Sequence, residues 1–181
     1  MAQIKRIGYG QVEPNHLSAQ KTGQIYAQLP AATVGQNGAL TAIAQLEQGQ
    51  FLKYDYANGA ADLTGAGEWL LVYCEEKLYD ERKQHHKDFV LKATDFTDGF
   101  IYPRLFRVEE GDTFTTNTFG ANTSDTAEVN GIALEAGDYV KVGNDGFLTT
   151  GTANDDAPVF QVAKVYTMPD GQPGVKLRRV K

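Results

Sequence analysis

The sequence has one cysteine, one tryptophan and no long apolar run in its 181 residues. A single cysteine, Cys74, excludes an internal disulfide bond, so packing alone must hold the fold together. Cys74 follows an apolar run at 69–73, and we interpret it as a small buried group rather than a reactive thiol. No stretch approaches the roughly 20 apolar residues that a membrane span needs. The first residues lack the apolar core of a signal peptide, so we expect a protein made in the cytoplasm and no membrane partner.

Histidines are few and are poorly arranged for metal binding. His85 and His86 are adjacent, so on a strand or a helix they point in different directions, and His16 is remote from both. The acidic segment GNDG at 143–146 lacks the ligand spacing of an EF-hand, which leaves only a weak loop-bound calcium open. We therefore expect no metal site and no cofactor.

Motifs that carry catalysis are also missing from the sequence. It has no glycine-rich phosphate loop, no Gly-x-Ser-x-Gly elbow, no His-Glu-x-x-His and no Cys-x-x-Cys. A glycosidase pair of carboxylates would meet only in the fold, and a single tryptophan is few for a sugar-binding cleft. The sequence therefore predicts a protein that is not an enzyme.

Positive charge is scarce and unevenly placed in a chain whose net charge is −6. Residues 109–156 contain ten acidic residues and one basic residue, Lys141, whereas residues 1–45 carry a net charge of +2. A broad acidic face is a poor surface for a phosphate backbone, so we do not expect a nucleic-acid partner. The basic residues near the end of the chain are expected to lie on the solvated face of a strand: Lys176, Arg178, Arg179 and Lys181.

The most informative feature that is present is an internal repeat. LEQGQFLKY at 46–54 returns as LEAGDYVKV at 134–142, and the shorter echo VEEGDTF lies between them at 108–114. The glycine before each strand, Gly49 or Gly137, is expected to supply a turn that requires a positive φ. We interpret each long copy as a β-meander, so that the chain uses one structural unit twice.

Alternating and turn-forming residues predict many short strands. Residues 52–56 alternate apolar and charged side chains, as a half-buried strand does, and 140–142 follow the same pattern. Turn signals such as Asn-Gly and Pro-Asp-Gly separate the segments. Further strands are expected at 69–74, 89–93, 100–108, 160–166 and 175–180. These features predict an all-β protein, an antiparallel barrel or sandwich built from two similar meanders.

One polar segment and the division of the body stay open at this point. Residues 75–87 are almost wholly polar and fit either a short helix or a long solvated loop. The β-rich body is expected to span 37–181, either as one unit or as two subdomains, 37–107 and 108–181.

Residues 1–36 differ from the rest of the chain. They are rich in Gln, Gly and Ala, and their isolated apolar residues follow neither a period of 2 nor one of 3.6. We expect an extended N-terminal arm that lies on a neighbouring protein, the alternative being a short helix within 15–29 packed on its own domain. The partner-binding residues expected in the arm are Ile4, Ile7, Tyr9, Val12, Leu17, Ile25, Tyr26 and Leu29.

Tyrosine and phenylalanine together make 18 residues, several of them beside glycine or threonine, as in 54–56 and 114–120. Aromatic residues suit strands, and those that are not in the core can anchor a protein interface. With no catalytic constellation in the sequence, we expect a protein that binds another protein.

Three segments carry a resemblance to a known class. GQVEPNHLSAQKTGQIYAQLPA at 10–31 resembles the N-terminal segments of small structural proteins encoded beside the major capsid protein in tailed bacteriophages. EEGDTFTTNTF at 109–119 and LEAGDYVKV at 134–142 are similar to the segments that open strands in capsid decoration, or cement, proteins. Taken together, the likeness covers most of the chain.

The resemblance implies a non-enzymatic virion protein that is made in the host cytoplasm and sits on the outer face of the capsid. Its partner would be the major capsid protein, and it would form a homo-oligomer, with a trimer favoured and a dimer as the alternative. The chain is larger than the simplest cement proteins, which suggests that the second meander is a displayed domain. Other interpretations are a tail tube, a head–tail joining protein, the base of a head fibre or a carbohydrate-binding β module.

Overall fold

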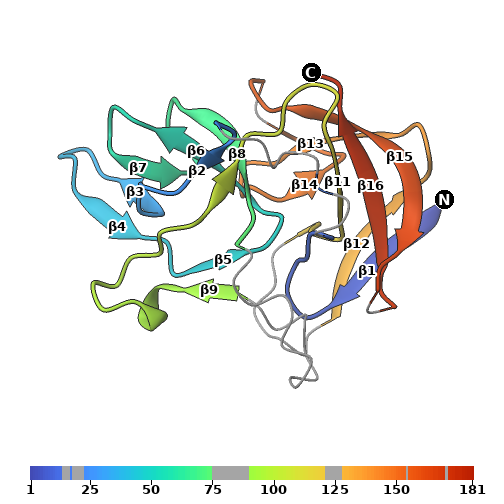
Figure 1. Cartoon of the computed structure of the whole chain (residues 1–181), viewed down its shortest axis with the longest axis horizontal. Coiled ribbons are helices and arrows are strands. Elements are labelled where there is room, and N and C mark those ends of the chain that lie inside the picture. The colour runs from blue at the N-terminus through green and yellow to red at the C-terminus, as the bar shows by residue number, and fades with distance from the viewer. Residues whose placement is uncertain (14–16, 18–22, 75–89, 121–127, 154, 170) are drawn as a thin grey trace.

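The fold was analysed in a computed structural model, which describes residues 1–13, 17, 23–74, 90–120, 128–153, 155–169 and 171–181. The described chain is almost entirely antiparallel β-structure, which confirms the predicted all-β class. Its one described helical element is a short 3-10 turn, Ala93–Asp95. The two largest sheets lie side by side in Figure 1, in a sandwich-like arrangement. The polar segment 75–87 and all three histidines lie outside the described residues.

Two five-stranded sheets form the body of the protein (Figure 1). The first sheet has the order β2 (Ile25–Tyr26), β10 (Leu105–Phe106), β8 (Glu68–Val72), β6 (Phe51–Asp55) and β7 (Ala60–Asp62). The second sheet has the order β11 (Thr113–Thr116), β16 (Pro173–Arg179), β15 (Val159–Thr167), β13 (Tyr139–Val142) and β14 (Leu148–Thr149).

Three two-stranded sheets surround these two. They pair β1 (Ala2–Ile7) with β12 (Glu128–Leu134), β3 (Ala32–Val34) with β4 (Leu40–Ala42), and β5 (Gln45–Glu47) with β9 (Val90–Lys92). The chain passes from the first five-stranded sheet to the second between β10 and β11, close to residue 108.

The sequence repeat is one turn, built three times. The glycines have φ values of 85°, 90° and 99° at Gly49, Gly111 and Gly137. In each copy the residue after the glycine donates its N–H to the carbonyl three residues earlier: Gln50 to Glu47 at 3.2 Å, Asp112 to Glu109 at 3.0 Å, and Asp138 to Glu135 at 3.2 Å. A four-residue turn in which the fourth residue donates its N–H to the carbonyl of the first, with a positive φ at the third residue alone, is a type II turn. The glycine is that third residue, which confirms the predicted need for glycine.

Two further hydrogen bonds recur in every copy of this turn. The residue after the glycine accepts, through its side chain, the N–H of the glutamate: Gln50 at 3.2 Å, Asp112 at 3.1 Å and Asp138 at 2.8 Å. The glycine N–H donates to a carbonyl on a neighbouring strand or its end, that of Val72, Arg179 or Val162. Each turn is therefore hydrogen-bonded to a distant part of the chain. The repeated sequence forms a turn that precedes a strand and is hydrogen-bonded to a distant segment.

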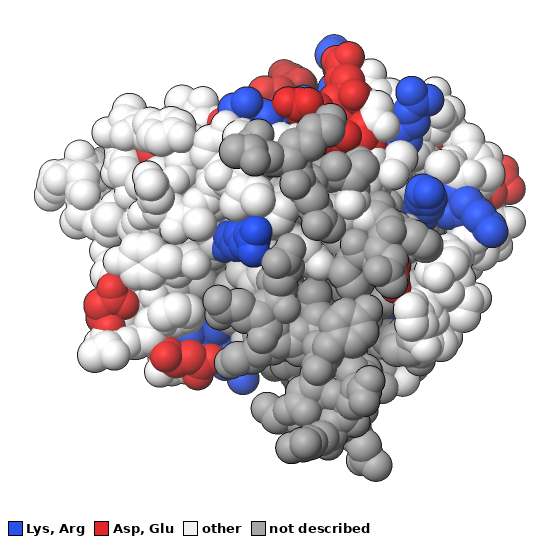
Figure 2. Space-filling model, viewed as in Figure 1, with Lys and Arg blue, Asp and Glu red and all other residues white. Residues whose placement is uncertain are grey.

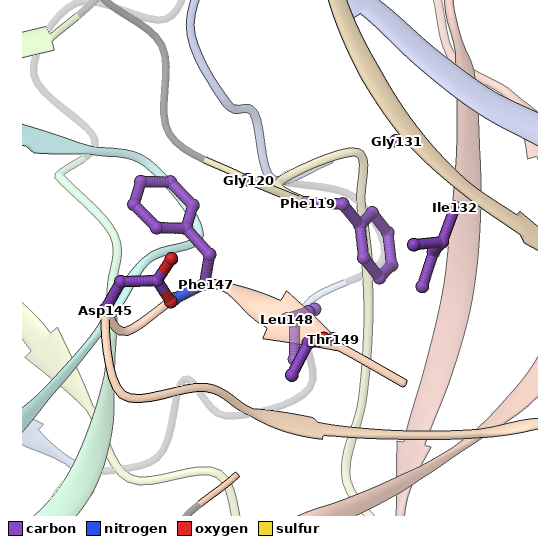
Figure 3. Close-up of a pocket in the computed structure, with 8 residues that line it drawn as sticks. All are labelled: Phe119, Gly120, Gly131, Ile132, Asp145, Phe147, Leu148 and Thr149. Atoms are coloured by element: carbon purple, nitrogen blue, oxygen red, sulfur yellow. The ribbon is translucent and has the colours of Figure 1, made fainter. Parts of the chain in front are cut away.

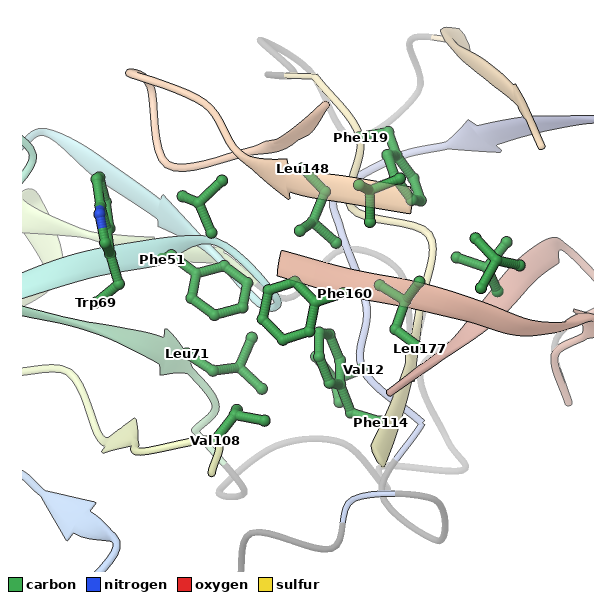
Figure 4. Close-up of a cluster of buried hydrophobic side chains, with 14 of the residues drawn as sticks. Val12, Phe51, Trp69, Leu71, Val108, Phe114, Phe119, Leu148, Phe160 and Leu177 are labelled. Atoms are coloured by element: carbon green, nitrogen blue, oxygen red, sulfur yellow. The ribbon is translucent and has the colours of Figure 1, made fainter. Parts of the chain in front are cut away.

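The two five-stranded sheets share one hydrophobic core (Figure 4). At its centre Phe51 from the first sheet meets Phe114 and Phe160 from the second, with ring centroids 5.3–6.1 Å apart. The backbone N–H of Phe51 also donates to the carbonyl of Gly146 at 2.8 Å. The two halves of the chain thus bury their apolar faces against each other.

The first sheet is covered on both faces. On the face away from the shared core, Leu52, Tyr54 and Leu70 pack into a second cluster with residues outside the sheet, among them Leu46 and Ile101. All five residues of β6 are buried, so the predicted half-buried strand is wrong at this copy of the repeat. The second copy, β13, alternates exposed and buried residues as predicted. The same pattern has two outcomes because, among the residues that the structure describes, the first sheet is covered on both faces and β13 leaves one face exposed.

The N-terminal segment packs on its own chain instead of extending away from it. β1 pairs with β12, and Val12 forms an isolated bridge with Thr116. The buried side chains of Arg6 and Glu47 form an ion pair of 2.6 Å, and Glu47 also accepts the N–H of Gly10. Four residues predicted to bind a partner are instead buried in this chain, namely Ile4, Tyr9, Val12 and Leu17. The prediction is wrong for these four because the shared core leaves an apolar seam that the segment fills.

Candidate protein interface

The remaining residues predicted to bind a partner lie at or near the surface. Ile7 and Ile25 are 45% and 36% exposed, whereas Tyr26 and Leu29 pack at the margin of the second cluster. Of these, Tyr26 on β2 belongs to a larger aromatic group that it forms with residues of β6 and of the turn after it. This group is the best candidate for a binding surface among the described residues.

We define the tyrosine cluster as Tyr26, Tyr54 and Tyr56 with the ion pair Arg107–Glu68. The ring of Tyr54 lies 5.1 Å from that of Tyr26 and 4.9 Å from that of Tyr56. Tyr54 is buried, and Tyr56 is 69% exposed. The buried ring of Tyr54 thus lies between the partly buried Tyr26 and the exposed Tyr56, and the exposed ring rests on a buried aromatic base.

A polar network fixes the loop that carries Tyr56. The carboxylate of Asp55 accepts hydrogen bonds from the N–H groups of Ala57 and Asn58 and from the Asn58 side chain at 2.8 Å. These hydrogen bonds, that from the Asn58 side chain first, hold the pKa of Asp55 below its ordinary value. Gly67 passes so close that an added Cβ would lie 2.2 Å from the carbonyl oxygen of Tyr54. Asp55 thus fixes the β6–β7 turn that carries Tyr56, and Gly67, in the loop between β7 and β8, lies against the backbone of β6.

Arg107 and Glu68 complete the polar edge of the cluster. Two nitrogens of Arg107 lie 2.7 Å from the two carboxylate oxygens of Glu68, and the guanidinium lies over the ring of Tyr26 at 5.2 Å. The hydrogen bond to Glu68 raises the pKa of Arg107, and burial raises that of the Tyr54 phenol. Tyrosine and arginine together are typical of the residues that anchor protein interfaces.

A separate small pocket lies beside β14 (Figure 3). Its cavity volume is about 190 Å³, and its apolar side chains include Phe119, Ile132, Phe147 and Leu148. The carboxylate at its rim, Asp145, accepts the N–H of Phe147 at 3.1 Å and so stabilises a turn. The volume is smaller than the roughly 300 Å³ at which small-molecule sites begin, so the pocket is a poor ligand site.

The described carboxylates were compared with the arrangement that a metal ion needs. Within the described part of the chain, no three His, Cys, Asp or Glu side chains gather as metal ligands would. Glu47 is paired with Arg6, and Asp156 with Lys53 at 2.8 Å, which lowers the pKa of Asp156. Trp69 is 4% exposed and lies under the Lys53 ammonium, so it offers no platform for a sugar ring.

Comparisons with protein-family models, with curated proteins and with solved structures find no match for this chain. Among the helices that the structure describes, none has the length and apolar character of a membrane span.

The sequence identified part of the tyrosine cluster. The sequence places Tyr26 among the partner-binding residues, and it leaves each aromatic residue of 54–56 as a core residue or an interface anchor, with core the safer interpretation for each singly. Arg107 and Glu68 were missed because they are 39 residues apart and no local pattern links them. The only signal for this pair in the sequence is that Glu68 directly precedes the predicted strand at 69–74 and that Arg107 lies near the end of the predicted strand at 100–108.

Proposed function

We propose that this chain is a non-enzymatic structural protein of a bacteriophage virion that binds the outer surface of the capsid and stabilises or decorates the shell. Its partner in this proposal is the major capsid protein. The observation that carries the proposal is the tyrosine cluster, an exposed aromatic side chain on a rigid base beside a paired arginine.

The resemblance of segments 10–31, 109–119 and 134–142 to decoration proteins supports the choice of partner. The structure alters the form of the contact, because much of the N-terminal segment is enclosed in its own chain. We therefore propose contact through a preformed surface, which loses less conformational entropy on binding than an arm that must become ordered.

A homo-oligomer, with a trimer favoured over a dimer, remains part of the proposal. Many identical copies on one shell would multiply a weak contact into firm attachment. Among the other virion roles, a tail tube would need a long interlocking loop, for which the sequence offers 75–88, a segment that lies outside the described residues. A head–tail joint and a fibre base are the further alternatives. A carbohydrate-binding module is disfavoured by the burial of Trp69.

Co-sedimentation with empty capsid shells of the same phage tests the proposal. The wild-type protein is expected to sediment with the shells in a saturable manner. Tyr56→Ala should weaken binding by about tenfold or more, as loss of an interface anchor does. Tyr102→Ala is the matched control, because Tyr102 is also exposed, at 44%, but lies outside the cluster and bonds to Asp98.

Two results would count against the proposal in different ways. If the wild-type protein stays in the supernatant, the capsid-binding role is wrong. If Tyr56→Ala and Tyr102→Ala bind shells as the wild type does, the role stands and the tyrosine cluster is not the contact.

A further inference from the structure

The outer face of the second sheet carries an unusual set of cations. Side chains directly opposite each other on antiparallel strands share a face, and here Lys164 on β15 lies opposite Lys176 on β16. Arg178, two residues after Lys176, and Lys141 on β13 are exposed on the same sheet. Figure 2 shows Lys and Arg side chains over the region of β15 and β16, among mostly uncharged residues.

The pairing of Lys164 with Lys176 works against stability. Like charges directly opposite each other on neighbouring strands are destabilising, whereas an acidic residue at either position would be favourable. Neither lysine, nor Arg178 or Lys141, forms an ion pair with any carboxylate that the structure describes. Departures from a local stability rule occur most often where function requires them.

The same face also carries groups that suit a protein partner. Tyr139 is 56% exposed and accepts a hydrogen bond from the amide of Gln161 at 3.2 Å, and Gln161 lies opposite Arg178. An exposed tyrosine held in place by a neighbour, beside an arginine, is typical of interface surfaces. The cationic face, defined as Tyr139, Lys141, Lys164, Lys176 and Arg178, thus joins positive charge to an aromatic contact.

We propose that the cationic face binds an acidic surface of another protein. Carboxylates flank the sheet in its strand-opening turns: Glu109, Glu110 and Glu135 are exposed, and Asp138 is partly exposed. A long polyanion such as duplex DNA would extend across these acids and be repelled, whereas a local acidic patch on a protein would not. The inference is independent of the tyrosine cluster, and it holds whether or not the partner is a capsid.

Binding of poly-L-glutamate, followed by isothermal titration calorimetry at low salt, tests the proposal. Lys164→Glu should weaken the binding about fivefold or more, since it removes one attractive charge and neutralises Lys176. Lys92→Glu is the matched control, because it makes the same change of charge at an exposed position on β9, in the other half of the molecule. It should bind poly-L-glutamate within twofold of the wild type, a margin set by the change in net charge alone.

Thermal unfolding supplies a second readout that a general charge effect would not give. Lys164→Glu replaces a repulsive cross-strand pair with an attractive one, so the variant should unfold at the same temperature as the wild type or at a higher one. Loss of binding with no loss of stability would support a face kept for recognition.

Three results would overturn the proposal. The first is no binding of poly-L-glutamate by the wild type, and the second is an equal loss of binding in Lys164→Glu and Lys92→Glu. The third is tighter binding to a DNA duplex than to poly-L-glutamate of similar total charge, which would assign the face to nucleic acid.

Discussion

Single glycines determine where the strands of this protein begin. Gly49 and Gly137 adopt the same positive φ in the same turn, but their surroundings differ. A Cβ on Gly137 would meet no atom within 4 Å, whereas one on Gly49 would lie 2.5 Å from Oγ1 of Thr118. One turn therefore requires glycine for its backbone conformation alone, and the other also requires it for space.

This difference predicts unequal losses of stability. Gly137→Ala should lower the free energy of unfolding by about 1–2 kcal/mol, the ordinary cost of left-handed backbone for a residue with a Cβ. Gly49→Ala should cost about 1–3 kcal/mol more, because a tightly packed neighbour must move. Urea denaturation of both variants measures the difference, and equal losses would show that the contact with Thr118 is relieved without cost.

Asp55 links the stability of the protein to pH. Its pKa is lowered in the folded state, chiefly by the hydrogen bond from the Asn58 side chain, relative to about 3.9 in an unfolded chain. A carboxylate of this kind stabilises the fold fully above its unfolded pKa, and the contribution is lost as the pH falls through the folded pKa. Acid should therefore destabilise the protein below about pH 4.

Asp55→Asn removes this linkage. Thermal unfolding between about pH 2 and pH 6 should show a shallower loss of stability for Asp55→Asn than for the wild type. Asp98 and Asp156 also have lowered pKa values, so some loss should remain in the variant. Curves of equal slope for the two proteins would contradict the role given to Asp55.

At the scale of elements, strand β1 is part of the fold and not an appendage. It contributes Ile4 to the shared core and Arg6 to a buried ion pair with Glu47. A protein that lacks residues 1–13 should therefore lose cooperative unfolding and expose Trp69, which a red shift of its fluorescence would report. If the truncated protein melts cooperatively and its fluorescence is unshifted, residues 1–13 are not needed for the fold, and the prediction of an independent N-terminal arm stands.

The buried ion pair can be tested separately from the chain segment. Arg6→Met leaves Glu47 charged and buried, which should cost about 3–5 kcal/mol. Arg6→Met combined with Glu47→Gln removes that charge and should recover part of the loss, because glutamine can still accept the N–H of Gly10. Urea denaturation of the two proteins provides the comparison. No recovery in the double variant would mean that the packing of Arg6 and its hydrogen bonds to the carbonyls of Gly8 and Gly120, not the charge left on Glu47, set the cost.

Elements with a local signal could be predicted from the sequence, and elements that depend on distant partners could not. The repeat and its alternation predicted β6, β13, β15 and β16 to within a few residues. β1 was missed because its partner, β12, lies more than 120 residues away and its own apolar residues do not alternate. Within the predicted strand at 100–108 the structure has strand β10 only at Leu105–Phe106, and Ile101 forms an isolated bridge with Ala31.

The candidate binding residues show the same division. Isolated apolar residues in the N-terminal segment have one pattern whether they contact a partner or fill a seam in their own chain. The sequence therefore could not separate Val12, which is buried, from Ile25, which is exposed. The row of tyrosines was partly visible, since Tyr54 and Tyr56 are two residues apart on one strand and its turn.

At the scale of the whole molecule, the two meanders act as one body. The aromatic group Phe51, Phe114 and Phe160 joins the sheets, and Lys53 on β6 reaches across to Asp156 in the second half. A body joined in this way can hold the tyrosine cluster and the cationic face in a fixed relation. Two partners could then be bound at once, as a protein that bridges subunits on a shell requires.

Cryo-electron microscopy of capsid shells incubated with the full-length protein tests the central claim most directly. The account predicts added density at regular positions on the outer surface, with the edge of the first sheet that carries Tyr56 against the shell. Shells that stay bare at saturating protein, or density that contacts the shell only through parts of the molecule remote from Tyr56, would contradict it.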